Sequence, residues 1–203
     1  MTAPVASADL RSAMILASVH RAFMEKGFDG ASMQDLAREA GMSVGNFYRY
    51  FPSKAAIVEA IITGDLAELE RDFSAIIGST NPMQSLRQTI KRHVEENLCD
   101  GQGRLWAEIT AVALRKPDIA MIVSRMETDL THYLTTVFSV TSGLALPETV
   151  NRFGGHAALV VLMVKASAMQ ACTTGAHRAD LTALVLRTIN QTLDEIPQKM
   201  LKG

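Results

Sequence analysis

The chain has 203 residues, of which 48% are hydrophobic, enough for one large domain or for a small domain joined to a larger one. Its net charge of −1 and its pI near 6.5 exclude a protein that coats nucleic acid indiscriminately, because such binding needs a broad basic surface. Cys99 and Cys172 are too few for a disulfide framework and lack metal-ligand spacing, and the N-terminus shows no signal-like apolar run. We therefore expect a cytoplasmic protein without a metal or another cofactor.

The first predicted helix begins near residues 7–9 and ends at Gly27. Ile15, Val19, Ala22 and Phe23 follow the i, i+4, i+7, i+8 spacing of a buried stripe. A glycine commonly ends a helix, because it accepts the left-handed conformation that follows the last turn. We expect this helix to support the segment that comes next.

Residues 32–54, SMQDLAREAGMSVGNFYRYFPSK, read as two short helices joined by a tight turn. Ser32 and Asp35 have the spacing of a capping box, which predicts a helix start. Gly41 can end that helix, and Ser43 can cap the next one. The segment therefore has the outline of a helix-turn-helix.

The second helix of this pair covers residues 44–51 and is stopped by Pro52. At 100° per residue its inner side carries Val44, Phe47 and Phe51, and its outer side carries Gly45, Asn46, Arg49 and Tyr50 with Tyr48 at the edge. An amide, a guanidinium and two phenols are suited to base edges and phosphate oxygens. The outer side is therefore a candidate DNA-reading face.

Lys54 lies in the first turn of the helix that follows, where a cation opposes the helix dipole. A phosphate bound at that helix end would explain the lysine. Residues 1–60 contain six basic and six acidic side chains, so this part of the chain is neutral. A dimer would double the phosphate contacts and compensate for weak binding by one copy.

The run DLAREAGMSVGNFYRYFPSKAAIVEAI resembles the DNA-binding segment of the TetR family of bacterial repressors. The family pattern is a small hydroxyl residue, then L-A-x-x-A-G-hydrophobic-S, then Y-x-x-F and S-K, and the match covers the first helix through the start of the fourth. The residues that the resemblance implies as DNA contacts are Ser32, Met33, Gln34, Ser43, Val44, Gly45, Asn46, Tyr48, Arg49, Tyr50 and Lys54. Asn46-Phe47 and Ala55-Ala56 depart from the family pattern, which affects the expected operator sequence and the helix capping.

An all-α fold of about nine helices follows from the resemblance and from the absence of period-two alternation in the later chain. We expect an N-terminal three-helix DNA-binding domain at residues 1–54 and a larger effector-binding and dimerisation domain at residues 55–203. The alternative is an ordinary helical corner, in which the helix pair of a small-molecule-binding protein or enzyme is only structural.

The fourth predicted helix runs from Ser53 to about Ile77, on the order of 35 Å. Its apolar stripe consists of Val58, Ile62, Leu66, Leu69, Phe73 and Ile76. Further helices are predicted at about residues 82–98, 104–116, 117–140, 147–174 and 178–195, with Pro82, Pro117 and Pro147 at their starts. The fourth helix is the expected mechanical link between the two domains.

The eighth helix is almost wholly apolar between Gly154 and Gly175, apart from Lys165 in its middle. A helix that is apolar on all sides needs neighbours on all sides. With the ninth helix it is expected to form a homodimer interface, as the resemblance also implies, through Ala157, Val161, Val164, Ala168, Ala171, Leu181, Leu184, Val185 and Thr188. A buried helix in a monomer and a membrane span are the alternatives.

A small-molecule effector is implied by the resemblance, although a related fold that binds DNA without an effector is an alternative. The residues expected to line an apolar pocket with a few polar anchors are His93, Asn97, Trp106, Met121, Met126, Phe138, His156 and Met163. For each polar anchor, His132 among them, the alternative is a satisfied buried or surface residue.

Catalysis is not expected from this sequence. A di-metal carboxylate enzyme would need repeated Glu-x-x-His motifs, whereas the chain offers only Asp129-x-x-His132. The sequence also lacks a glycine-rich phosphate loop and a G-x-S-x-G elbow.

Overall fold

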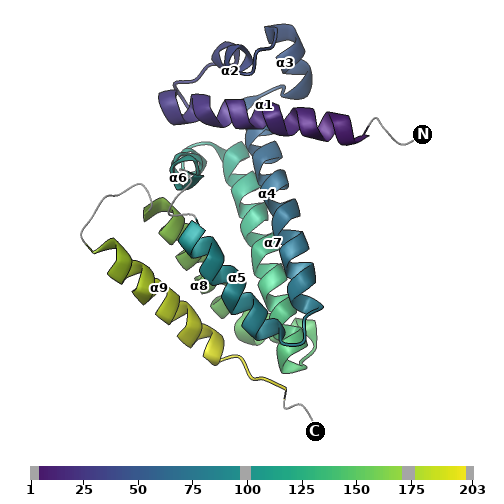
Figure 1. Cartoon of the computed structure of the whole chain (residues 1–203), viewed down its shortest axis with the longest axis vertical. Coiled ribbons are helices and arrows are strands. Elements are labelled where there is room, and N and C mark those ends of the chain that lie inside the picture. Colours follow the sequence, from purple (N-terminus) through teal and green to yellow (C-terminus); the bar gives the residue numbers. More distant parts are fainter. Residues whose placement is uncertain (1–4, 97–101, 171–176, 200–203) are drawn as a thin grey trace. The chain divides into compact units, whose positions relative to one another are not determined.

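The structure is a computed structural model that describes residues 5–96, 102–170 and 177–199, which form nine helices and no strand (Figure 1). The helices are α1 (Val5–Lys26), α2 (Met33–Glu39), α3 (Val44–Tyr50), α4 (Lys54–Ile77), α5 (Pro82–Glu96), α6 (Gln102–Ala113), α7 (Pro117–Ser142), α8 (Leu146–Gln170) and α9 (Arg178–Asp194). The all-α prediction is confirmed. Asn97 and Ala171, expected in the pocket and in the interface respectively, lie outside the described residues.

The chain divides into two compact units. The N-terminal unit consists of Met1–Asp65 and Ala107–Val123, and the C-terminal unit consists of Leu66–Trp106 and Ser124–Gly203. The N-terminal unit therefore extends past the boundary expected at residue 54. Buried side chains from the start of α4, the end of α6 and the start of α7 explain this extension, and they include Ile57, Val58, Ile109, Val112 and Ile119.

The N-terminal unit is built around the apolar stripe of α1. Ile15, Val19, Ala22 and Phe23 are buried, as predicted from their spacing. Gly27 has a φ of 71°, so the chain turns back after α1 and brings the ring of Phe28 onto Phe23, with 5.1 Å between the ring centroids.

The core of the C-terminal unit joins α4, α5, α7, α8 and α9. Its buried members are Phe73, Ile76, Met83, Leu86, Ile90, Val94, Leu134, Val137, Phe138, Phe153, Ala157, Val160, Val161, Ile189, Leu193 and Ile196. Helix α8 packs against α9, and α5 packs against both. Neighbours on several sides account for the apolar composition of α8. None of the helices in the described segments is long and apolar enough to cross a membrane.

Gly103, in the first turn of α6, meets the backbone of α8 inside the C-terminal unit. A Cβ atom at this position would lie 1.7 Å from the carbonyl oxygen of Ala168. Only a residue without a side chain allows this approach, because a backbone carbonyl cannot rotate aside as a flexible side chain can.

We predict that Gly103→Ala destabilises the chain by about 2 kcal/mol or more, because the overlap with the Ala168 carbonyl outweighs the gain in helix propensity. The matched control is Gly64→Ala in α4, where no atom lies within 4 Å of the added Cβ. This control should stabilise the chain by about 0.5–1 kcal/mol. Urea unfolding followed by circular dichroism measures both effects, and equal midpoints for the two variants would contradict the close approach.

Candidate nucleic-acid interface

The start of α2 is fixed by the predicted capping box. Ser32 Oγ accepts a hydrogen bond from the backbone N–H of Asp35 (3.1 Å), and the Asp35 carboxylate accepts one from the backbone N–H of Ser32 (3.0 Å). Lys26 Nζ and Arg38 Nη2 donate to the same carboxylate at 2.6 and 2.5 Å. The bond from Lys26, followed by those from Ser32, holds the pKa of Asp35 well below its usual range. Asp35 therefore remains charged and keeps the start of α2 in place.

The turn between α2 and α3 also follows the prediction. Gly41 has a φ of 64°, and Ser43 caps α3 by accepting a hydrogen bond from the N–H of Asn46 at 3.4 Å. Phe47 and Phe51 are buried with their ring centroids 5.6 Å apart, so they hold the inner side of α3 against the core of the N-terminal unit. This anchoring fixes which side of α3 faces solvent.

The solvent-facing side of α3 contains most of the predicted DNA contacts. Gly45, Tyr48, Arg49 and Tyr50 are exposed, and Asn46 is half-buried. Val44, counted on the inner side from the helical period, is 39% exposed and therefore stands with the outer residues. No atom lies within 4 Å of a Cβ built on Gly45, so this part of the helix is open to a close partner.

Three further predicted DNA contacts lie at the start of α2, the helix that precedes α3 in the sequence. Ser32 and Gln34 are exposed, and Met33 is half-buried. Consecutive short helices thus contribute ten of the eleven predicted positions. The eleventh, Lys54, lies at the start of α4 and has a different environment.

Lys54 has partners within the chain. Its ammonium donates to the carbonyl oxygens of Phe28 (2.7 Å) and Asp29 (3.1 Å), and it lies 5.3 Å from the centroid of the Phe28 ring. Burial, followed by the charge of Lys116, lowers the pKa of Lys54. These contacts account for a lysine at a helix N-terminus without a bound phosphate.

Residues far away in the sequence complete this cluster, which we call the Phe28 clamp: Phe28, Asp29, Lys54, Glu108, Arg115 and Lys116. The Asp29 carboxylate accepts from Arg115 (2.9 Å) and Lys116 (2.8 Å), and the hydrogen bond from Lys116 is the main cause of its lowered pKa. Glu108 accepts from the backbone N–H of Phe28 at 3.3 Å, and Lys116 lies 5.4 Å from the Phe28 ring. The clamp ties the α1–α2 loop to the corner between α6 and α7.

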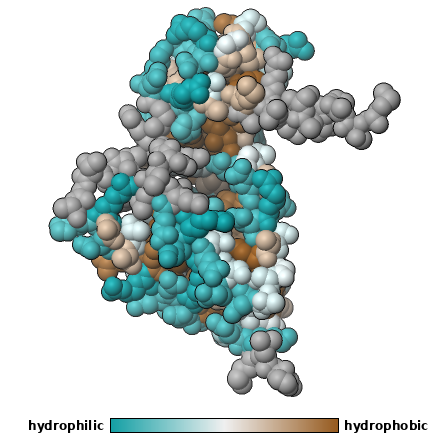
Figure 2. All heavy atoms as spheres, in the orientation of Figure 1, coloured by the Kyte–Doolittle hydropathy of each residue, from teal (hydrophilic) through white to brown (hydrophobic). Residues whose placement is uncertain are grey.

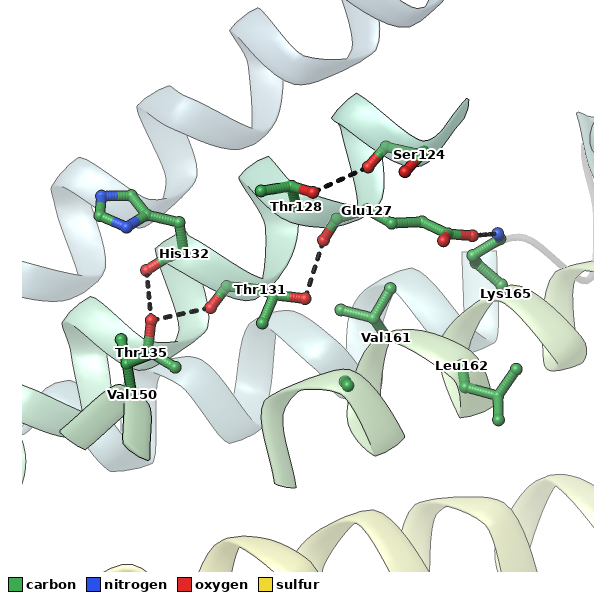
Figure 3. Close-up of a pocket in the computed structure, with 11 residues that line it drawn as sticks. Ser124, Glu127, Thr128, Thr131, His132, Thr135, Val150, Val161, Leu162 and Lys165 are labelled. Carbon is green, nitrogen blue, oxygen red and sulfur yellow. Dashed lines mark hydrogen bonds and ion pairs between the residues drawn. The ribbon is translucent and has the colours of Figure 1, made fainter. Parts of the chain in front are cut away.

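The residues expected to line an effector pocket differ in their exposure. Met126 and Phe138 are buried, Trp106 and Met163 are half-buried, and Met121 is 66% exposed. The structure shows a groove of about 450 Å³ between α7 and α8. His132, one of the expected polar anchors, lines this groove, and the other described residues of the expected set do not (Figure 3).

Of the three expected histidine anchors, His132 lines the groove, and His93 and His156 each lie near a carboxylate, although Nε2 of His93 makes no hydrogen bond. His156 Nε2 lies 2.8 Å from Glu195 Oε2, and its ring meets Phe153 edge-on. His93 Nε2 lies 3.4 Å from Asp72 Oδ2. No group of three or more His, Cys, Asp and Glu side chains in the described segments is placed to hold a metal ion.

The expected dimer residues fall into three groups by their exposure. Ala157, Val161 and Ala168 are buried within the chain, so their side chains are not available to a partner in this conformation, and Val164 and Val185 are half-buried. Leu181, Leu184 and Thr188 on α9 are exposed. The exposed large apolar side chains near the middle and end of α8 are instead Leu159, Leu162 and Met169.

The helix-turn-helix segment is similar to segments of known proteins. Residues 15–61, from α1 into α4, match the model for bacterial regulatory proteins of the tetR family. The transcriptional regulator UidR of Escherichia coli K12 is 28% identical over 120 residues, which are 59% of this chain and 60% of UidR. The match thus spans about three fifths of that relative.

Solved structures share the fold of the whole chain. Salmonella enterica GusR superposes with a TM-score of 0.68 at 20% identity, covering 96% of this chain and 98% of GusR. The regulator FadR from Bacillus subtilis, in complex with stearoyl-CoA, has a TM-score of 0.65 at 15% identity and covers 90% of this chain and 96% of FadR. The helix-turn-helix geometry and these findings lead to one assignment: residues 15–61 are a segment of the type found in bacterial regulatory proteins of the tetR family, and the chain as a whole shares the fold of GusR and FadR.

Proposed function

We propose that this chain is a cytoplasmic DNA-binding transcriptional regulator that acts as a repressor on a palindromic operator. The observation that carries the proposal is α3, a seven-residue helix whose aromatic anchors Phe47 and Phe51 are buried while its amide, guanidinium and phenol groups face outward. A helix of this kind enters the major groove in helix-turn-helix proteins. UidR, which is 28% identical over 120 residues, is a regulator of the helix-turn-helix type.

Two groups of side chains divide the work of DNA binding in this proposal. Asn46 and Arg49 read base edges, because an amide pairs with adenine and a guanidinium with guanine in the major groove. Ser32, Ser43, Tyr48 and the neighbouring predicted contacts fix the helix pair against phosphate oxygens. Lys54 contributes through the Phe28 clamp as well as by its charge.

Dimerisation through α8 and α9 supplies the second reading helix. Leu159 on α8 and Leu184 on α9 are 43% and 49% exposed, and exposed leucines on neighbouring helices are typical of a protein interface. Figure 2 shows apolar patches among hydrophilic surface along the α9 side of the C-terminal unit. A two-fold dimer would place two α3 helices about 34–36 Å apart, one turn of DNA.

A small-molecule effector regulates DNA binding in this proposal. FadR, with the same fold, was solved with stearoyl-CoA bound. A ligand that prefers a conformation with another spacing of the two α3 helices must weaken DNA binding, because the coupling between the two sites is reciprocal. Helix α4, which belongs to both units, is the proposed moving part.

We predict that Asn46→Ala and Arg49→Ala change which DNA sequences the protein selects, each relaxing one base position at a cost of about 1–3 kcal/mol. Selection from random DNA with the purified protein measures this, and the wild type should enrich a palindrome. Arg71→Ala, which removes an exposed arginine of the C-terminal unit, is the matched control and should leave the profile unchanged. Failure of the wild type to enrich any palindrome would refute the proposed function.

The two roles of Lys54 can be separated by a comparison with Lys116. Both ammonium groups flank the Phe28 ring, but Lys116 lies in the α6–α7 corner rather than beside the reading helices in the sequence. We predict that Lys54→Met weakens binding to all DNA sequences and reduces the salt slope by about 1, whereas Lys116→Met leaves the slope unchanged. Fluorescence anisotropy over a range of salt concentrations gives both slopes. Equal slopes in the two variants would show that Lys54 acts only through the clamp.

The dimer proposal predicts that the double change Leu159→Glu and Leu184→Glu yields a monomer, because buried carboxylates without partners oppose association. Leu114→Glu is the matched control, since Leu114 is 86% exposed and lies in the N-terminal unit. Sedimentation velocity measures the mass of each variant. A dimer that survives the double change would place the interface elsewhere.

A further inference from the structure

The groove between α7 and α8 has one polar wall, which belongs to α7. Thr128, Thr131 and Thr135 follow one another at spacings of three and four residues, so they share one face of the helix (Figure 3). Their hydroxyls donate to the carbonyl oxygens of Ser124 (2.9 Å), Glu127 (2.8 Å) and Thr131 (2.9 Å) respectively. Because each hydroxyl proton is used inside the helix, the oxygen atoms of the exposed Thr128 and the half-buried Thr131 remain as acceptors, whereas Thr135 is buried at the base of this wall. This wall therefore suits a molecule that donates hydrogen bonds.

The charges that line the groove cancel. Lys165 Nζ on α8 donates to Glu127 Oε1 on α7, and the lysine side chain is only 21% exposed. Among the described residues of the groove lining, these two are the only Asp, Glu, Lys or Arg side chains. An anion that binds Lys165 would also approach the negative charge of Glu127. The anion would lose its hydration on binding, and a lysine already paired with a carboxylate compensates this loss poorly. The groove therefore favours an uncharged molecule.

Apolar side chains of α8 form the opposite wall. Val150, Ala158 and Leu162 line the groove and are exposed, and Val161 closes it towards the core. Covering this wall with an apolar group removes hydrocarbon from water and contributes to binding in proportion to the area covered. The volume of about 450 Å³ is within the usual range for small-molecule sites, about 300–1,000 Å³.

We propose that the α7–α8 groove binds an uncharged small molecule that carries hydroxyl groups along one edge and an apolar body along the other. The hydroxyls donate to the threonine oxygens and to Glu127, Lys165 donates to a ligand oxygen, and the apolar body covers Val150, Ala158 and Leu162. This inference rests on the proposed function, because the molecule in the groove is the effector proposed there. It also explains why a lysine interrupts the apolar run of α8.

The test uses hexyl β-D-glucoside, a neutral probe with both a hydroxyl-bearing ring and an apolar chain. Isothermal titration calorimetry of the full chain without DNA should show saturable binding that is tighter than that of glucose or of hexanoate. In an isotope-labelled sample, the methyl resonances of Val150, Ala158 and Leu162 should shift with the probe. Absence of saturable binding, or tighter binding of hexanoate, would overturn the proposal.

Matched threonine variants test the acceptor wall. Thr128→Val combined with Thr131→Val removes the two accessible acceptors and should weaken the binding of the glucoside about tenfold or more. Thr136→Val is the control, because Thr136 makes the same type of bond to its own helix (2.9 Å, to the His132 carbonyl) but does not line the groove. An equal loss of glucoside affinity in the control and in the double variant would contradict the proposal, because it would show that the hydroxyls affect only the stability of α7.

The charge argument has its own test. Glu127→Gln leaves Lys165 without its counter-ion, so hexanoate should now bind in the groove at least about tenfold more tightly than to the wild type. An unchanged hexanoate affinity would contradict the assignment of Lys165 as a ligand donor. A shift of the Leu162 methyl resonances with protein concentration, and not with the glucoside, would identify a second copy of the chain as the occupant.

DNA binding provides a separate outcome. If the unliganded protein selects no operator, the proposed function fails while the calorimetry still decides whether the groove is a site. If the operator binds and the glucoside binds in the groove without weakening DNA binding, the groove is not the effector site and this inference is overturned. Release of the operator at glucoside concentrations that fill the groove is the expected result.

Discussion

Two helices of seven residues cannot persist alone in water, because nucleating a helix costs more than so few hydrogen bonds return. The geometry of α2 and α3 therefore depends on the burial of Leu36, Ala37 and Phe47, none of which is accessible to solvent. The capping bonds of Ser32 and Ser43 set where each helix begins, but the buried faces set how α3 is turned. The outward position of Asn46 and Arg49 is thus a consequence of the inward position of Phe47.

The Phe28 clamp extends this dependence to parts of the chain that are distant in sequence. The α1–α2 loop leads directly into α2, and its backbone is bound by Lys54 at the start of α4 and by Glu108 in the middle of α6. Both α4 and α6 contain residues of both units, whereas Arg115 and Lys116 lie between α6 and α7. In the proposed function, α4 and α6 are the route through which an effector would influence α3.

Much of the fold was predictable, because local signals determine it. Pro82 and Pro117 mark helix starts, Gly27 and Gly41 mark left-handed helix ends, and the stripe from Ile15 to Phe23 marks the buried side of α1. Across the described residues the predicted helix boundaries agree with the structure within a few residues. The outward position of the other α3 side chains was predictable from the helical period, whereas the exposure of Val44 was not.

The clamp and the groove were not predictable in the same way. Asp29 and Lys116 are 87 positions apart, and no periodicity relates them. The pocket prediction favoured adaptable apolar residues such as Met126 and Phe138, but these side chains fill the interior, as apolar side chains in a close-packed protein usually do. On α8, helical counting could group Ala157, Val161 and Ala168 into one seam, but it could not tell whether that seam faced the chain's own core or a partner.

Helix α8 therefore has three distinct environments, and each explains a different part of its composition. Small and branched residues, such as Ala157 and Val160, meet the core, Leu159 is exposed, and Lys165 faces Glu127 across the groove. Leu162 is 61% exposed and belongs both to the groove wall and to the exposed apolar residues of α8. In a dimer formed through α8 and α9, a partner chain that covers Leu162 would also cover one rim of the groove. Ligand binding and dimerisation would then act on the same side chain, so the affinity of each would depend on the other.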